Sequence, residues 1–284
     1  MKKRCKEMKK IITMTAWRRA HYFKEVIQSI ENAEGHEQYE LIVSIDGGYS
    51  EQQMLMKEVL EQCSIPYELH IHEQNKGCAW NTGFVVRKGF NKAERIIHLE
   101  DDTILHPDAL KWFEFNLDKY EDNPLIWSIS AWNLGNDTLV GEWTEIELVG
   151  IRQKFTCGAW AMWKSRYDEI QTWFGIILKE ESRERFYELV HNDKKDLVSG
   201  DNFLDYVDLA DRGSWGYPMD YYWRGKRYEI APHVSMNQNI GREYGSFNSP
   251  ALYDLRQNSN SWRPFERVSD FDTDFVDEFL EELQ

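Results

Sequence analysis

The chain has 284 residues, of which 42% are hydrophobic and 14% aromatic, and it carries a formal net charge of −15 at pH 7. This negative charge disfavours non-specific binding to nucleic acid or to an anionic membrane surface. No apolar run approaches the ~20 residues of a transmembrane helix, and the basic start at residues 1–4 is not followed by the apolar segment of a secretory signal. We therefore expect no membrane span and no nucleic-acid partner.

The cysteines are widely spaced along the chain and form no CxxC pair; they are Cys5, Cys63, Cys78 and Cys157. Isolated thiols indicate a reducing compartment rather than a disulfide framework. The sequence thus predicts a cytoplasmic protein. Its length suits either one large domain or two halves that share a core.

The first half of the chain alternates short aliphatic or β-branched runs with segments that carry apolar residues at helical spacing. These patterns predict strands at residues 10–15, 40–46, 67–72, 95–99 and 125–131, and helices at 22–32, 51–62, 81–90 and 107–120. Strands that alternate with helices favour an α/β fold with a mainly parallel sheet and right-handed crossovers.

After about Gly135 the alternation stops, and turns, aromatic residues and glycines dominate. Strands are expected at residues 155–163 and 229–234, and a charged helix at 182–198. The tail, residues 269–284, carries apolar side chains among many Asp and Glu, which predicts an acidic amphipathic helix.

Three consecutive carboxylates, Glu100, Asp101 and Asp102, directly follow the predicted strand at 95–99. Buried carboxylates need a cation, hydrogen-bond donors or water, and ligands of open α/β sheets bind beyond the carboxyl ends of the strands. Hard oxygen ligands in such a place suit Mg²⁺ or Mn²⁺, which complete their shells with substrate phosphates. A metal–diphosphate site is therefore one interpretation. The other is a solvated acidic turn in which Asp102 or Asp108 caps the next helix.

Polar residues that suit a nucleoside diphosphate follow two other predicted strands. Thr15 ends the first predicted strand, Arg18 and Arg19 come shortly after it, and the arginines supply positive charge for phosphates. Asp46 ends the second predicted strand and a Gly-Gly turn follows it, which offers acceptors and close backbone approach. The loop at residues 75–81 adds a lysine and backbone N–H groups at a helix N-terminus. Taken singly, these are more typical of surface salt bridges and turns, but their order favours a shared ligand.

Residues 41–48, 97–102 and 123–133 resemble the metal-dependent glycosyltransferases of the GT-A fold. The most similar group is the N-acetylglucosaminyltransferase family that initiates complex N-glycan branches and extends O-mannosyl glycans. Residues 155–160 resemble the Gly-rich segment that follows the catalytic acids of that family. The resemblance implies a Rossmann-like GT-A sheet, mostly parallel and flanked by helices, with a smaller mixed half on the acceptor side.

The resemblance also implies a role for each matching residue on the donor side. Asp46 would hold the uracil of a UDP-sugar, Arg19 or its neighbour Arg18 would meet the diphosphate, and Asp101 would contact the ribose. The other donor contacts expected are Thr15, Lys76, Asn81, Glu100 and Trp160, with packing in the core as the alternative for the tryptophan.

Asp102 would be the single direct protein ligand of Mn²⁺ or Mg²⁺, which neutralises charge on the departing UDP. The resembled family inverts the anomeric centre, so a general base must deprotonate the acceptor hydroxyl. Asp220, which has aromatic residues on its C-terminal side, is the candidate, because such neighbours can raise a carboxyl pKa and stack on a sugar. Asp211 and Asp201 are the alternatives, and Asp220 as a plain turn residue is a further one.

The sequence therefore predicts an inverting glycosyltransferase that transfers a sugar, with GlcNAc as the leading candidate, from a UDP-sugar to a hydroxyl of a glycan or other acceptor. Residues 1–134 would bind the donor, 135–262 would bind the acceptor and supply the base, and 263–284 would form the acidic tail. Residues 237–241, together with residues 242–245 that follow, resemble a flexible segment that closes over the donor, with an ordinary Asn/Gly loop as the alternative. The competing functions are a nucleotidyltransferase acting on sugar phosphates and a non-catalytic nucleotide-sugar or glycan-binding protein of the same fold.

Overall fold

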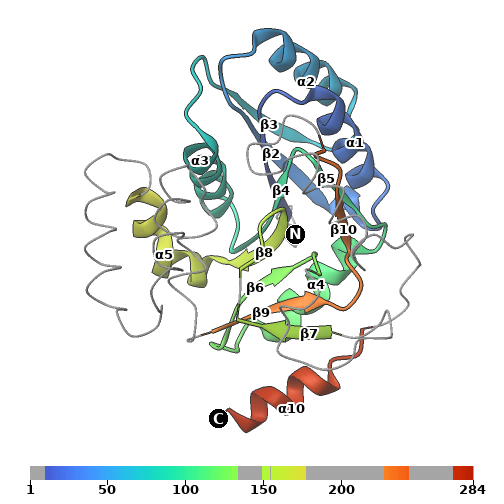
Figure 1. Ribbon diagram of the computed structural model, residues 1–284, viewed down its shortest axis with the longest axis vertical. Coiled ribbons are helices and arrows are strands. Elements are labelled where there is room, and N and C mark those ends of the chain that lie inside the picture. The colour runs from blue at the N-terminus through green and yellow to red at the C-terminus, as the bar shows by residue number, and fades with distance from the viewer. Residues whose placement is uncertain (1–9, 134–148, 154, 177–226, 243–270, 284) are drawn as a thin grey trace, which may run out of the picture.

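The structure, a computed structural model, describes residues 10–133, 149–153, 155–176, 227–242 and 271–283. These residues build an eight-stranded sheet in the order β3-β2-β1-β4-β8-β6-β9-β7 and a small sheet of β5 and β10, with helices around them (Figure 1). The strands are β1 (Lys10–Ala16), β2 (Tyr39–Ile45), β3 (Tyr67–Ile71), β4 (Arg95–Glu100), β5 (Thr103–Leu105), β6 (Ile126–Ser130), β7 (Val149–Arg152), β8 (Ala159–Trp163), β9 (Tyr228–Pro232) and β10 (Asn237–Asn239). The helices are α1 (Ala20–Glu31), the 3₁₀ turn η1 (His36–Gln38), α2 (Ser50–Gln62), α3 (Cys78–Phe90), α4 (Ala109–Tyr120), α5 (Lys164–Ile176) and α10 (Asp274–Glu282).

The first half of the large sheet is parallel, because β1 pairs with both β2 and β4, and β2 pairs with β3. The register places Ala16 beside Ile45 and Thr15 beside Glu100. The ends of three strands therefore lie at one edge, as the sequence predicts. Beyond β4 the sheet is mixed, since β8 pairs antiparallel with β4 and β7 antiparallel with β9, whereas β6 pairs parallel with β9. The predicted α/β class, with a mostly parallel sheet and a smaller mixed part, is confirmed.

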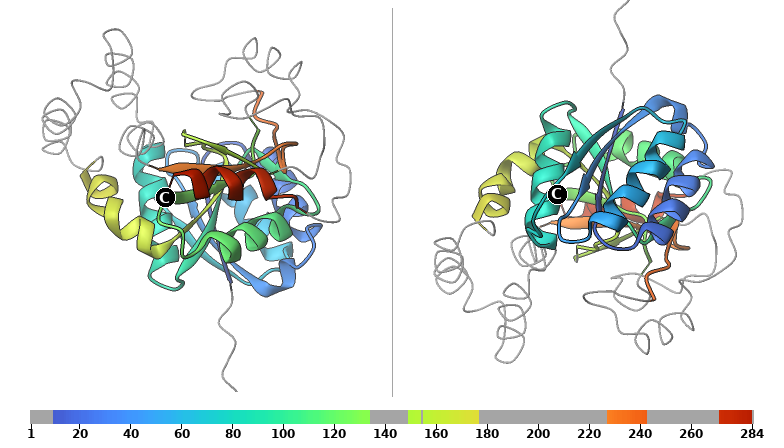
Figure 2. Two further views of the ribbon diagram at one scale, coloured as in Figure 1. Left: turned by 90° about the horizontal axis from the view of Figure 1, so that it is seen from below. Right: turned by 90° about the horizontal axis from the view of Figure 1, so that it is seen from above.

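Helices cover both faces of this sheet (Figure 2). On one face, α1, α2 and α4 bury apolar side chains such as Phe23, Leu60 and Phe113 in one hydrophobic cluster with the strands. On the other face, α3 and α5 contribute a second cluster that includes Val85 and Tyr167. The two apolar layers enclose the strands between them, whereas polar side chains lie at the strand ends.

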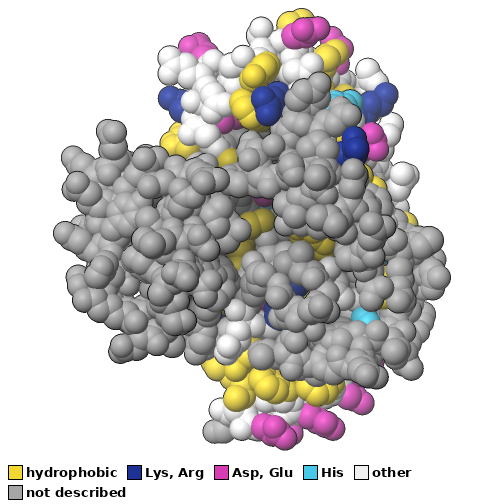
Figure 3. Space-filling view, viewed as in Figure 1, with side chains coloured by type: hydrophobic (Ala, Val, Ile, Leu, Met, Phe, Trp, Pro, Cys, Tyr) yellow, Lys and Arg dark blue, Asp and Glu magenta, His cyan; other side chains and the backbone are white. Residues whose placement is uncertain are grey.

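The acidic tail forms α10, which packs on the second half of the sheet (Figure 1). Val276 and Leu280 are buried, and the ring of Phe279 lies 5.3 Å from that of Tyr228. Acidic side chains gather along this helix at the lower end of the molecule in Figure 3. The expected acidic amphipathic helix is confirmed, and its apolar side is a packing surface.

Five described elements are not predicted by the sequence patterns, namely η1, β5, β7, β10 and α5. β5 and β10 have three residues each, and the Asn-Gln-Asn sequence of β10 has no apolar alternation, so periodicity has nothing to detect there. The strand expected from residue 155 begins only at Ala159. The helix expected at 182–198 lies outside the described residues. Among the helices described, none combines the length and the apolar character that a membrane crossing requires.

Candidate active site

An acid pair, defined here as the carboxylates of Asp101 and Asp102, occupies the turn between β4 and β5. Each residue is only 4% exposed. Asp108 takes the N-cap position of α4 but its side chain makes no capping hydrogen bond to that helix. The side chain of Asp102 instead bonds to groups from distant parts of the chain. The buried acid pair therefore differs from the solvated, helix-capping turn that was the alternative interpretation.

The guanidinium of Arg19 lies between the two carboxylates. Its Nη1 donates to Asp102 Oδ2 at 2.6 Å, and its Nη2 donates to Asp101 Oδ1. Burial by itself would lower the pKa of Arg19, but the two carboxylates raise it above its usual value, so the charge is permanent. Burial, together with the charge of Asp101, raises the pKa of Asp102, and Arg19 opposes that rise.

The other two carboxylate oxygens also accept hydrogen bonds. The backbone N–H of Trp17 donates to Asp101 Oδ2 at 3.2 Å, and Asn239 Nδ2 donates to Asp102 Oδ1 at 3.1 Å. The backbone of Ile240 donates to the carbonyl of Asp102 at 2.7 Å. The residue after β1 and the residues at the end of β10 thus enclose the acid pair from two sides.

Asp46, at the end of β2, organises the loop before α3. Its Oδ1 accepts the N–H groups of Gly47 and Lys76 at 2.9 and 2.8 Å, and its Oδ2 accepts the N–H of Gly77 at 2.9 Å. A Cβ on Gly47 would lie 2.2 Å from the backbone of Gln74, so the close passage of the two loops requires glycine there. The carboxylate predicted to face uracil therefore also fixes the backbone of the neighbouring loop.

Trp17 connects these two centres. While its backbone N–H donates to Asp101, its indole Nε1 donates to the carbonyl of Gly47 at 3.0 Å. Its ring lies edge-on to that of Tyr49, with 5.5 Å between centroids. The three strand ends predicted to share a ligand are thus joined by direct hydrogen bonds.

The remaining predicted donor residues occupy different surroundings. Thr15 is buried next to Glu100, which is partly exposed, whereas Lys76 is exposed. The guanidinium of Arg18 lies over the ring of Trp17, 4.3 Å from its centroid. Their contacts with a donor stay predictions.

Asn81 and Trp160 lie inside the protein. The Nδ2 of Asn81 donates to the carbonyl of Ser44 at 3.1 Å, and its Oδ1 accepts from the hydroxyl of Ser44. Trp160 is fully buried, with its ring 5.2 Å from His98 and 5.5 Å from Phe155. Both side chains therefore pack against the strands beneath the site. For Trp160, this agrees with packing in the core, the alternative to a contact with the donor.

The three candidate bases, Asp220, Asp211 and Asp201, lie outside the described residues. The site as described therefore contains the donor side of the predicted chemistry. The identity of the general base stays a prediction.

Sequence reasoning did not assign a role to Asn239, Gly241 or Trp17. The segment at residues 237–241 was noted only for its resemblance to a closing loop, and the bond from Asn239 to Asp102 spans 137 positions. The one available signal is the Asn-Gln-Asn-Ile-Gly sequence itself, in which short polar residues precede a glycine.

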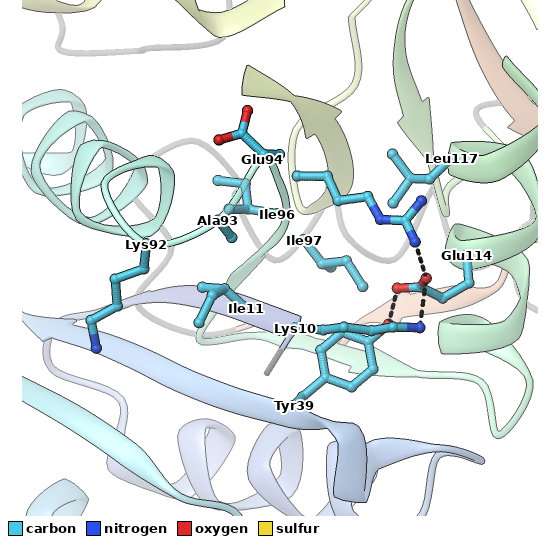
Figure 4. A pocket seen from close by; sticks show the side chains of 11 residues that line it. Lys10, Ile11, Tyr39, Lys92, Ala93, Glu94, Ile96, Ile97, Glu114 and Leu117 are labelled. Carbon is cyan, nitrogen blue, oxygen red and sulfur yellow. Dashed lines mark hydrogen bonds and ion pairs between the residues drawn. The ribbon is translucent and has the colours of Figure 1, made fainter. Parts of the chain in front are cut away.

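A separate pocket of about 250 Å³ lies at the opposite edge of the sheet, where β1, β2 and β4 begin (Figure 4). Three polar groups of its lining converge on one carboxylate: Glu114 accepts from Lys10 at 2.7 Å, from Arg95 at 3.0 Å and from the Tyr39 hydroxyl at 2.5 Å. The central carboxylate is therefore neutralised by its own neighbours, and this pocket lacks the open acidic chemistry of a metal site.

The acid pair has the donor chemistry that a hard divalent cation requires. Two buried carboxylates face one guanidinium, so one negative charge is left without a partner charge in the pair. Across the described part of the chain, no group of three or more His, Cys, Asp or Glu side chains converges. These carboxylates are hard oxygen ligands of the kind that Mn²⁺ or Mg²⁺ takes, and Asp102 as the single direct protein ligand of such an ion stays a prediction.

No protein-family profile matches the chain, and no curated protein matches it. Several solved structures that align with it are glycosyltransferases. S. aureus TarS 1–349 in complex with UDP-GlcNAc aligns with 13% identity and a TM-score of 0.37, covering 49% of this chain and 38% of that chain. The mannosyltransferase PcManGT from Pyrobaculum calidifontis, in complex with GDP-Man and Mn²⁺, aligns with 11% identity and a TM-score of 0.43 over 75% and 73% of the two chains. LgtC, in complex with donor and acceptor sugar analogs, aligns with 12% identity and a TM-score of 0.43, covering 90% of this chain and 84% of that chain. Sequence identities and TM-scores this low do not assign the chain to a family.

Proposed function

We propose that the protein is a metal-dependent, inverting glycosyltransferase of the GT-A type that uses a UDP-sugar, with UDP-GlcNAc as the leading candidate. The observation that supports this most directly is the joining of three strand ends through Trp17, which bonds to Asp101 on one side and to the Asp46–Gly47 turn on the other. A metal–diphosphate group and a nucleobase need two such centres side by side.

Each residue of the site has a distinct task in this proposal. Asp46 and the loop that it holds accept the uracil, Asp101 contacts the ribose, and Arg19 meets the diphosphate as a bidentate donor. Glu100 lies at the end of β4, where it can accept hydroxyls of the donor sugar. The ion held by Asp102 supplies positive charge that offsets the charge on the leaving UDP.

The acceptor side of the proposal rests on the sequence. Asp220, with Asp211 and Asp201 as alternatives, removes the proton of the acceptor hydroxyl on the face opposite UDP, which gives inversion. A glycan or another hydroxyl compound is the acceptor class. A cytoplasmic location accords with Cys63, Cys78 and Cys157, which are free thiols in the structure.

Thermal unfolding with UDP and Mn²⁺, each alone and together, tests this function. A ligand at ~100 times its dissociation constant adds about 2.7 kcal/mol to the free energy of unfolding, which for a chain of this size raises Tm by about 5–10 °C at the ~2–4 °C per kcal/mol expected. We expect this shift only with UDP and Mn²⁺ together, and its loss in Asp102→Asn. Asp118→Asn, which removes the same charge from a 67% exposed side chain of α4, is the matched control.

Other outcomes separate the competing functions. Equal shifts with and without Mn²⁺ contradict metal dependence. A shift with a nucleoside triphosphate and a sugar phosphate, but not with UDP, supports a nucleotidyltransferase. If UDP binds with Mn²⁺ but a panel of UDP-sugars releases no UDP with any hydroxyl acceptor or with water, the protein is a binding module. Release of UDP from one donor identifies the sugar.

A further inference from the structure

Arg19 occupies the position in which a cation shared by Asp101 and Asp102 would lie. It contacts one oxygen of each carboxylate, and the other two oxygens already accept from Trp17 and Asn239. All four oxygens of the acid pair are therefore engaged by the protein itself, and both side chains are 6% exposed.

A guanidinium and a divalent ion cannot share this position. The guanidinium keeps its proton under all ordinary conditions, so it cannot become neutral to admit a second cation. Like charges a few ångströms apart repel strongly in a site with little water. A divalent ion can bind the oxygens that Arg19 now holds only after the arginine has moved.

The surroundings of Arg19 indicate where its guanidinium would go. Arg19 is the N-cap residue of α1, and the first turn of that helix contains no acidic side chain. The N–H groups and the dipole of a helix N-terminus favour an anion, and a guanidinium binds phosphate oxygens in the same bidentate manner as carboxylates. A diphosphate beside α1 would therefore compete with the acid pair for the same arginine.

We propose that Arg19 is an internal counter-cation of the acid pair, which a nucleoside diphosphate draws away so that a divalent ion takes its place. This inference rests on the function proposed above and adds to it a coupling between the binding of the nucleotide and the binding of the ion. In the free protein the acid pair is closed to divalent ions, and the nucleotide and the ion bind synergistically because each removes an obstacle to the other. Reciprocal coupling of this kind typically amounts to about 5–150-fold in affinity.

Binding of Mn²⁺, followed by the electron paramagnetic resonance signal of the free ion, tests the proposal without any turnover. The titrations use wild-type protein, Arg19→Gln and Arg95→Gln, each with and without UDP, and are corrected for the Mn²⁺–UDP complex measured without protein. Arg95→Gln removes the same charge from a residue that pairs with Glu114 and Asp118 at the opposite edge of the sheet.

We expect UDP to tighten Mn²⁺ binding to the wild type at least about 10-fold, within the usual range of such couplings. Arg19→Gln should bind Mn²⁺ without UDP at least about 10-fold more tightly than the wild type and lose most of the enhancement by UDP. Arg95→Gln should behave like the wild type. If Arg19→Gln does not fold, Arg19→Lys replaces it, because a single ammonium bridges two carboxylates less well and should give a smaller change in the same direction.

Two results overturn the inference and leave the proposed function intact. One is equal Mn²⁺ affinity of the wild type with and without UDP, and the other is equal affinity of the wild type and the Arg19 variant for Mn²⁺ alone. If neither protein binds Mn²⁺ under any of these conditions, both the inference and the metal dependence of the proposed function fail together.

Discussion

Gly241 lies directly against the carboxylate of Asp102. A Cβ built on this glycine would be 2.0 Å from Asp102 Oδ2 and 3.0 Å from Arg19 Nη1. The carboxylate cannot give way easily, because its side chain is short and buried. The carboxylate of Asp102 can therefore keep its position only because residue 241 has no side chain.

Gly241→Ala should displace the Asp102 carboxylate and weaken the metal-dependent binding of UDP. We expect a reduction of kcat/KM of about 100-fold, in line with ångström-scale misplacement of a catalytic group, measured as UDP release. Ile240→Ala, in the same segment, adds no atom next to the acid and should lose much less. If the two variants have equal activity and equal Mn²⁺-dependent binding of UDP, Gly241 has no such role.

Asp46→Asn should weaken the hydrogen bonds that hold the loop before α3. An amide group in place of the carboxylate would present a donor to the N–H of Lys76 or Gly77, and a buried donor without an acceptor costs about 1–3 kcal/mol. The free energy of unfolding in urea measures this loss. Asn75→Ala is the control, because it removes only the exposed second acceptor of the Gly77 N–H, at 2.8 Å. Equal stability of the two variants would show that Asp46 does not hold the loop.

The ion pair of Arg152 and Glu229 is fully buried, with 0% exposure of both side chains. Arg152 Nε and Nη2 donate to Glu229 Oε1 at 2.9 and 2.7 Å, and Ser128 Oγ donates to Oε2 at 2.7 Å. Glu229→Gln leaves the guanidinium without its counter-charge, and breaking a buried pair in this way costs about 3–5 kcal/mol.

Arg227 and Glu169 provide the comparison, since their ion pair at 3.0 Å is partly exposed. Glu169→Gln should cost less than about 1 kcal/mol, as exposed pairs do. Replacing both buried partners, as Arg152→Met with Glu229→Leu, should cost less than Glu229→Gln alone. Urea unfolding of the four proteins decides this, and similar losses for Glu169→Gln and Glu229→Gln would contradict it.

The parts of the site that could be predicted are those whose position follows from the strand pattern. Thr15, Asp46 and the acid pair each lie at the end of a predicted strand, and parallel pairing brings the ends of such strands to one edge of the sheet. That rule needs no knowledge of side-chain packing. It placed the donor-side acids and Arg19 in one neighbourhood from the order of the residues alone.

The parts that could not be predicted depend on contacts between distant segments. Asn239 reaches Asp102 across 137 positions, and Arg152 reaches Glu229 across 77. A lone Arg in a short strand has the same pattern whether its partner is solvent or a buried carboxylate. The hydrogen bonds to all four oxygens of the acid pair likewise depend on the fold. The sequence predicts that the acids and the arginine belong to one site, but not that they bond to each other.

His98, on β4 just before the acid triplet, should make stability depend on pH. Burial lowers the pKa of His98 to about 3, from 6.5 for the free side chain. Between these two values the unfolded chain binds one proton more than the folded protein at this site, so the free energy of unfolding falls as pH is lowered below about 6.5. The slope from this residue approaches about 1.4 kcal/mol per pH unit.

His98→Gln should abolish this part of the slope, which urea unfolding at pH 7, 6 and 5 measures. Thr13→Val is the matched control: it removes the hydroxyl that lies 3.0 Å from Nδ1 of the histidine but keeps the ring that titrates. Its stability should be lower at every pH while the slope persists. Equal slopes for the wild type and His98→Gln would mean that the buried imidazole is not the group that the unfolded chain protonates, and the source of acid sensitivity would then lie among the carboxylates.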